Sequence, residues 1–149
     1  MSFDVSLVGR IEICKTLRDV KSQQRRDIIG TAIERLLLRE NKTNYHRNHH
    51  SSSASLINAF IGFAPMSPSN GAKCTIQVGK TNLTIGTEFT HEYCHISLTG
   101  LDRQIPRLFY YVVRIFNLSY CQRMLFLFEC QNEETSKSLL TNVRNRFAV

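Results

Sequence analysis

Arg123 is the residue of this sequence that most invites a chemical explanation, because it stands at the start of an apolar strand. The segment CQRMLFLFEC, residues 121–130, contains an unbroken apolar run from Met124 to Phe128, which is typical of a buried strand. A cation in that position has two interpretations. Its aliphatic stem can lie along the strand while the guanidinium stays in water. Alternatively, the guanidinium can bind an anion, since its planar fork donates paired hydrogen bonds to phosphate.

A second group of cations surrounds the start of the first predicted helix, at Lys15, Arg18, Lys21, Arg25 and Arg26. The chain carries 19 Lys and Arg residues against 12 Asp and Glu, a net charge of +7. Such a surface attracts nucleic acid, anionic lipid or phosphorylated ligands. The cluster is either a solvated face or a phosphoinositide patch formed by Lys15, Lys21, Arg25 and Arg26. Nucleic acid has no support beyond charge and is not an expected partner.

The other reactive side chains predict neither a metal site nor a catalytic centre. His46, His49 and His50 lie in a Ser- and Asn-rich segment without cysteine or carboxylate support, so a loop is favoured over a metal site. The five cysteines are scattered without a CxxC pair, and most are expected to be buried free thiols. Nucleophile-elbow, phosphate-binding glycine-loop and HExxH motifs are absent. Asp102 and His95 have no evident nucleophile partner, so we expect no enzyme, no metal and no cofactor.

The elements before residue 73 are predicted to be a strand, a helix and an insertion. Residues 3–14 alternate between apolar and polar or small side chains, which favours a half-buried strand with Gly9 at a bend or bulge. Residues 25–40 carry apolar side chains on one helical face, at positions 28, 29, 32, 33, 36 and 37. Residues 41–72 form an insertion between this helix and the second strand, with a short helix expected in ASLINAFIGFAPM.

The elements from residue 73 onward are predicted to be strands followed by one helix. A hairpin is predicted from KCTIQV and NLTIG, joined by GKT. The segment EFTHEYCHISLTG contains two short runs that could be successive strands. RLFYYVVRI and MLFLFEC are rich in aromatic or apolar residues that favour strands. The tail repeats apolar residues at helical spacing, from Leu139 to Phe147. With roughly six antiparallel strands after the insertion, the order predicts an α+β fold of the PH-like superfold. It is an antiparallel sandwich or partly open barrel of about seven strands, capped by the C-terminal helix.

The ordered set of motifs resembles a phosphotyrosine-binding (PTB) domain. These motifs cover nearly the whole chain outside residues 41–72. They are, in order, FDVSLVGRIEI, an amphipathic helix, CHISLTGLD, FYYVV, RMLFLFEC and a terminal helix ending in Phe. The most similar type is that of the Shc adaptor, on the strength of VGRIEICKTLR, SSASLINAFIGFA, HISL and CQRMLFLFEC. The resemblance implies a single domain over residues 1–149.

The resemblance also implies a binding site. Shc-type domains bind Asn-Pro-x-phosphotyrosine peptides as an added strand, in a groove between the fifth strand and the C-terminal helix. The phosphate contacts carried over by position are Arg18, Ser97, Arg114 and Arg123. The groove residues carried over are His95, Ile96, Leu98, Thr99, Val143 and Phe147. The chain departs from the Shc pattern with Arg114 for a lysine, Leu98 for a phenylalanine, and Arg144 and Arg146 in an otherwise uncharged run.

The expected function is therefore a non-catalytic, monomeric adaptor module whose partners are tyrosine-phosphorylated tails with Asn-Pro-x-Tyr motifs. One alternative keeps the groove but binds Asn-Pro-x-Tyr or Phe without phosphate. Another binds phosphoinositides and recruits the domain to the inner face of the plasma membrane. The start MSFDVSLVGR lacks a signal-peptide layout, and no apolar stretch approaches the ~20 residues that span a bilayer. A cytoplasmic location is expected.

Overall fold

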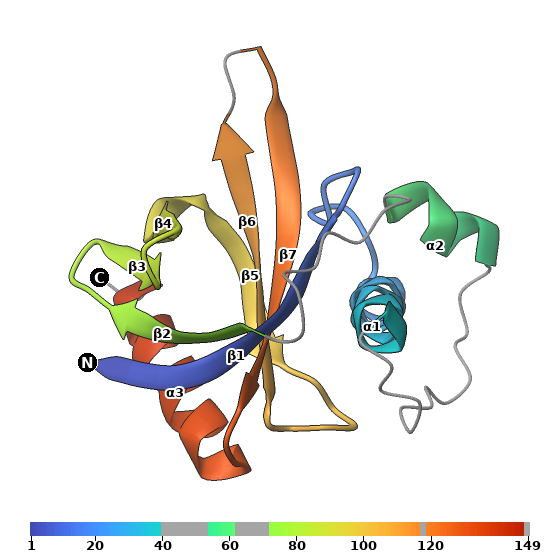
Figure 1. Ribbon diagram of the computed structural model, residues 1–149. Coiled ribbons are helices and arrows are strands. Elements are labelled where there is room, and N and C mark those ends of the chain that lie inside the picture. Colours follow the sequence, from blue (N-terminus) through green and yellow to red (C-terminus); the bar gives the residue numbers. More distant parts are fainter. Residues whose placement is uncertain (40–53, 62–71, 117–118, 148–149) are drawn as a thin grey trace.

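The fold consists of one antiparallel sheet with helices on both of its faces (Figure 1). The computed structural model describes residues 1–39, 54–61, 72–116 and 119–147. The strands are β1 (Ser2–Glu12), β2 (Ala72–Val78), β3 (Asn82–Ile85), β4 (Phe89–Glu92), β5 (Ile96–Leu101), β6 (Leu108–Phe116) and β7 (Cys121–Cys130). The helices are α1 (Ser22–Arg39), α2 (Ala54–Phe60), α3 (Glu133–Phe147) and the one-turn η1 (Tyr93–His95). The histidines at 46, 49 and 50, and most of the predicted insertion, lie outside the described residues.

The seven strands follow the order β4-β3-β2-β1-β7-β6-β5. The predicted antiparallel sheet of about seven strands with a C-terminal helix is confirmed. The sheet is not closed into a barrel, because β4 and β5 are the two ends of the order and do not pair with each other. In the part of the chain that the structure describes, β5 therefore has a neighbour on one side only. An unpaired edge of this kind offers main-chain groups to an added strand.

A bulge in β1 places its two halves against different cores. Leu7 pairs with Phe128 and Gly9 pairs with Leu127, so Val8 is the extra residue. Val5 and Leu7 belong to the core on one face of the sheet, whereas Ile11 and Ile13 belong to the core on the other. The period-2 pattern predicted the strand and the bulge near Gly9 correctly, but it did not show this exchange of faces.

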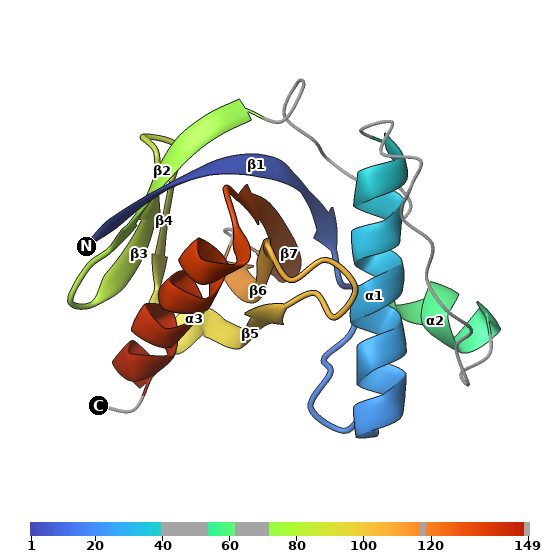
Figure 2. The same ribbon diagram turned by 90° about the horizontal axis from the view of Figure 1, so that it is seen from below.

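The concave face of the sheet encloses an aromatic core that α3 covers (Figure 2). Tyr111, Phe126 and Phe128 are fully buried and stack with ring centroids 5.3 to 6.4 Å apart. Leu139 and Val143 of α3 are 0% exposed and close this core. The burial of α3 thus depends on the helical spacing that the sequence predicted.

The opposite face is covered by α1 and α2. All the apolar positions predicted for the first helix are buried, namely Ile28, Ile29, Ala32, Ile33, Leu36 and Leu37. The predicted short helix is confirmed as α2, whose Ile57 and Phe60 join the same core. Because both faces of β7 are covered, Phe126 and Phe128 enter one core while Leu125 and Leu127 enter the other. Burial on two faces explains the unbroken apolar run of this strand.

None of the helices within the described ranges is both long and apolar enough to cross a membrane.

Candidate functional site: an arginine pocket beside an open strand edge

Four arginines and a serine line one cavity of about 480 Å³, here called the arginine pocket. It lies where the segment after β1, the start of α1 and the strands β5, β6 and β7 meet. Its lining residues are Thr16, Leu17, Arg18, Arg25, Ser97, Leu98, Val112, Arg114 and Arg123. The fold thus brings together Arg18, Ser97, Arg114 and Arg123, the residues carried over from the PTB resemblance. No carboxylate is among the lining residues.

Strand register places two of the arginines side by side. Arg114 of β6 pairs directly with Arg123 of β7, and both side chains are half-buried. Like charges directly opposite each other on neighbouring strands are destabilising. Among the described residues, neither arginine forms an ion pair with a carboxylate. An anion bound in the pocket would be attracted to both guanidinium groups and would offset their mutual repulsion.

A second bulge aims Ser97 into the pocket. Ile96 pairs with Val113 and Leu98 pairs with Val112, so Ser97 is the extra residue of β5. Ile96 is buried in the aromatic core, whereas Ser97 and Leu98 both line the pocket. A bulge of this kind re-aims a side chain without ending the strand. The exposed Ser97 hydroxyl donates to the Val112 carbonyl over 3.4 Å, a long hydrogen bond that a better acceptor can replace.

Arg25 is a pocket residue that the sequence did not identify as one. Sequence reasoning placed it in a surface patch, but its Nη2 donates to the carbonyls of Leu17 and Val20 over 3.2 and 3.3 Å. Its side chain is half-buried, and its Nε has no hydrogen-bond partner within the described part of the chain. The only sequence feature that could have indicated this is its position, one turn into the helix that follows Arg18.

The groove residues predicted from the sequence occupy different environments along β5 and α3. His95 lies in η1, so the edge strand is Ile96–Leu101 and not His95–Thr99. Val143 is 0% exposed and packs in the core, so it offers no contact surface. Phe147 is 39% exposed and packs edge-on against Tyr93, with ring centroids 6.0 Å apart. Phe147 is therefore available to a ligand.

A larger cavity of about 630 Å³, here called the trough, continues from the pocket along β5. Its lining residues come from α1, from β5 and the loop between β5 and β6, with one residue each from β6 and α3. Its lining residues are Ser22, Gln23, Arg25, Arg26, Asp27, Ile29, Gly30, Ile33, Leu98, Thr99, Gly100, Leu101, Asp102, Arg103, Gln104, Tyr110 and Arg144. Sequence reasoning did not predict this cavity.

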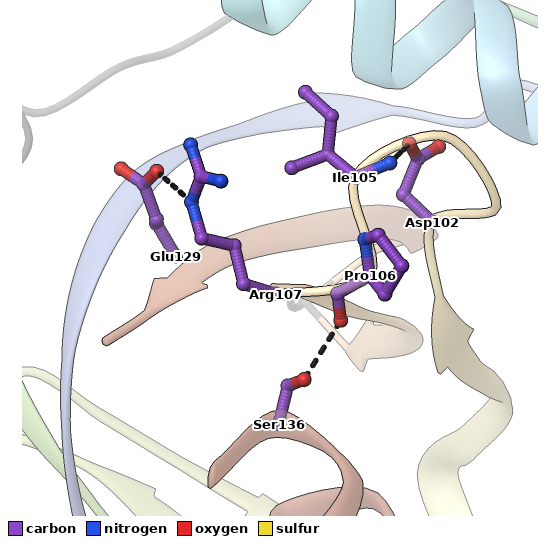
Figure 3. Close-up of polar contacts among 6 residues, drawn as sticks. All are labelled: Asp102, Ile105, Pro106, Arg107, Glu129 and Ser136. Carbon is purple, nitrogen blue, oxygen red and sulfur yellow. Dashed lines mark hydrogen bonds and ion pairs between the residues drawn. The ribbon is translucent and has the colours of Figure 1, made fainter. Parts of the chain in front are cut away.

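Polar contacts hold the loop between β5 and β6 in place (Figure 3). The Asp102 carboxylate, 7% exposed, accepts hydrogen bonds from the main-chain N–H groups of Gln104 and Ile105 over 3.1 and 2.9 Å. The Ser136 hydroxyl of α3 donates to the Pro106 carbonyl over 2.7 Å. These bonds hold the loop between β5 and β6, which forms one side of the trough, at its first residue and against α3.

Asp102→Ala is expected to destabilise the protein by about 1–3 kcal/mol, because the main-chain N–H groups of Gln104 and Ile105, in partly buried hydrogen bonds, lose their acceptor. Asp102→Asn should cost less, since both bonds are accepted by Oδ2 and an amide oxygen in its place can still accept them. The free energy of unfolding, measured with urea for both variants, checks this. An alanine variant as stable as the parent would show that the carboxylate does not hold the turn.

The remaining basic patch residues do not converge. Lys15 and Lys21 are exposed, and the Lys15 ammonium lies 5.6 Å from the centre of the Phe60 ring. Arg26 is exposed on α1 and lines the trough. With Arg25 turned into the pocket, the patch predicted for phosphoinositides is divided between two cavities and open surface.

One group of side chains has the ligand types for a metal. Glu92, Cys94 and His95 bring their ligand atoms within 4.8 Å of one another. Cys94 Sγ lies 3.5 Å from the Glu92 carboxylate and His95 Nε2 lies 4.0 Å from it. These contacts are explained by a hydrogen bond from Cys94 to Glu92 and by the position of His95 near the same carboxylate, at an exposed turn.

Sequence comparisons do not identify the chain. No protein-family model matches it, and no curated protein matches it either. A solved structure does match, that of the C-terminal phosphotyrosine interaction domain of mouse APBB2, with a TM-score of 0.60 over 100% of this chain and 86% of that one. The chain has the fold of a phosphotyrosine interaction domain. At 15% identity, this likeness supports the fold and does not distinguish the Shc type. The matching protein is described as an interaction domain and not as an enzyme.

Proposed function

We propose that this domain is a non-catalytic adaptor module that binds Asn-Pro-x-phosphotyrosine motifs in the tails of receptors or signalling proteins. The observation that carries the proposal is the arginine pocket itself. Its cations converge without a neutralising carboxylate, at the end of a strand whose outer edge is unpaired among the described residues. Phosphate and peptide main chain are the two chemistries that such a site would satisfy together.

The composition of the pocket suits a phosphorylated aromatic side chain. A phosphotyrosine carries about −1.5 to −2 charges and three acceptor oxygens. The guanidinium groups supply charge-assisted donors, and Ser97 adds a hydroxyl. Leu17, Leu98 and Val112 provide apolar walls for the ring. A bare inorganic anion would use the donors and leave these apolar walls without a partner.

The edge of β5 would bind the rest of the peptide. An extended segment that adds to a sheet edge gains main-chain hydrogen bonds, while side-chain pockets give specificity. The edge begins beside the arginine pocket and runs past α3, since Ser97 lines the pocket and α3 packs beside β5. Phe147 lies next to Tyr93 at the start of this edge and offers an exposed aromatic surface to the peptide.

The test is a fluorescence titration of one labelled Asn-Pro-x-Tyr peptide, with and without the phosphate, at low and high salt. We expect the phosphorylated form to bind more tightly, and its advantage to shrink as salt screens the charges. Equal affinity of both forms at both salt concentrations would refute phosphate recognition and support a phosphorylation-independent groove.

Vesicles containing a phosphoinositide serve as the lipid arm of the same test. We favour the peptide, because the predicted lipid patch does not converge on one surface and loses Arg25 to the pocket. Binding to such vesicles without binding to either peptide would replace the proposal with a lipid-binding function and recruitment to the inner face of the plasma membrane.

A further inference from the structure

The trough and the arginine pocket adjoin each other. They share Arg25 and Leu98, and the β5 side of the trough is formed by Leu98 to Leu101. This is the same stretch whose outer edge is unpaired within the described residues. A ligand whose phosphate lies in the pocket and whose main chain adds to β5 must therefore run through the trough.

The exposed charged side chains of the trough are all arginines. Arg26 comes from α1, Arg103 from the loop after β5 and Arg144 from α3. The two acidic lining residues, Asp27 and Asp102, are only 2% and 7% exposed. The positive charge is therefore on the surface that a ligand meets, and the negative charge lies beneath it.

Both buried carboxylates are also engaged within the protein. Asp27 accepts a hydrogen bond from the Gln23 side chain over 3.2 Å, and Asp102 accepts the loop N–H groups described above. A buried carboxylate that already accepts hydrogen bonds within the protein competes weakly for the exposed arginines of the trough. The exposed arginines are thus available to a partner.

Arginines from two different helices affect the pKa of Tyr110, which lines the trough. Its pKa is raised by burial and by the charge of Asp102, and lowered by the charges of Arg144 and Arg25. Arg144 belongs to α3 and Arg25 to α1. The two helices therefore direct positive charge towards the same lining residue.

We infer that the peptide ligand carries acidic side chains before its phosphotyrosine, and that Arg103 and Arg144 select for them. This rests on the proposed function. Every strand pair in the sheet is antiparallel, and an added strand of the same kind would place the residues before the phosphotyrosine over the trough. Leu101 lies roughly 14 Å along the strand from Ser97. The acidic side chains are therefore expected roughly four to seven positions upstream.

The experiment compares three Asn-Pro-x-phosphotyrosine peptides that differ only in those upstream positions, which hold glutamate, glutamine or lysine. We expect the glutamate peptide to bind the parent about 5- to 20-fold more tightly than the glutamine peptide at low salt. The charge-reversed variants Arg103→Glu and Arg144→Glu should each lower this preference, and the double variant should favour the lysine peptide. Lys73→Glu is the matched control, because Lys73 is exposed on β2 and lines neither cavity.

The possible outcomes distinguish a failure of this inference from a failure of the proposed phosphopeptide binding. If the parent binds all phosphopeptides through Arg123 but does not distinguish glutamate from glutamine, the acidic preference is wrong and the proposed function stands. A failure of every phosphopeptide to bind would overturn both. Thermal melting of each variant shows whether it is folded, and the exposed position of both arginines makes a loss of fold unexpected. Equal effects of Lys73→Glu and Arg144→Glu would attribute the preference to net charge and contradict the inference.

Discussion

Replacing Arg123 by glutamine is expected to weaken the binding of an Asn-Pro-x-phosphotyrosine peptide by roughly 10- to 100-fold. The guanidinium offers a charge-assisted, paired contact that the neutral amide cannot reproduce. Glutamine keeps part of the aliphatic stem and a polar head, so the start of β7 remains compatible with its surroundings. The dissociation constants of the two proteins for the same peptide measure the effect.

The free domain should not lose stability in the same variant. Arg123 pairs directly with Arg114 across the two strands, so its removal relieves a repulsion between like charges. We expect the free energy of unfolding without ligand to stay unchanged or to rise by a few tenths of a kcal/mol. A residue kept for structure would show the opposite result, which makes this measurement a test of function.

Two controls define the interpretation. Lys73→Gln removes the same formal charge outside both cavities and should leave peptide affinity unchanged apart from a small effect of net charge. The unphosphorylated peptide should bind the parent and Arg123→Gln equally. If Arg123→Gln binds the phosphopeptide as tightly as the parent does, the arginine is a solvated strand end and the pocket assignment is wrong.

The protein is expected to lose stability between pH 6.5 and pH 4 because of His91. This imidazole is 8% exposed and lies among Phe89, Tyr111 and Phe126. Burial, with smaller contributions from the charges of Arg10 and His95, lowers its pKa from 6.5 to about 4. Its Nε2 has no hydrogen-bond partner within the described residues, so nothing there offsets the cost of protonation.

The sign follows from proton binding in the two states. Between pH 6.5 and pH 4 the unfolded chain binds a proton at this position and the folded protein does not. The stabilising contribution is complete above pH 6.5 and is lost as the pH falls to about 4, in total on the order of 3 kcal/mol. Unfolding by urea across this range measures it.

His91→Phe provides the comparison, because phenylalanine keeps an aromatic ring in the core and cannot be protonated. The difference in unfolding free energy between the parent and His91→Phe should grow as the pH falls from 7 to 4.5. Parallel curves for the two proteins would show that His91 does not cause the loss in acid, and that the carboxylates titrating at lower pH account for it.

The sequence by itself determined the elements and their order, because these depend on local spacing. Every apolar position predicted for the first helix is buried in α1, since a period of 3.6 residues defines one face without reference to the rest of the chain. The apolar run at Met124–Phe128 likewise indicated a buried strand. The resemblance to PTB domains then selected Arg18, Ser97, Arg114 and Arg123, which the fold places around one cavity.

Only the tertiary structure decided which face each side chain occupies. Val5 and Ile11 share the same alternation in the sequence, yet the bulge at Val8 sends them into different cores. The bulge at Ser97 turns a strand serine towards the pocket. Bulges arise from the register between strands that are distant in sequence, and a one-residue slip reverses every side chain beyond it.

The same reason explains why sequence reasoning misplaced Arg25 and did not predict the trough. Arg25 belongs to a basic run that a linear view assigns to the surface, but packing of α1 turns it into the pocket. Arg103 and Arg144 are 41 residues apart in the sequence, and they meet in one trough because α3 packs along β5. Local patterns determine the strands and helices of this protein, whereas the charge that a ligand meets depends on how those elements pack together.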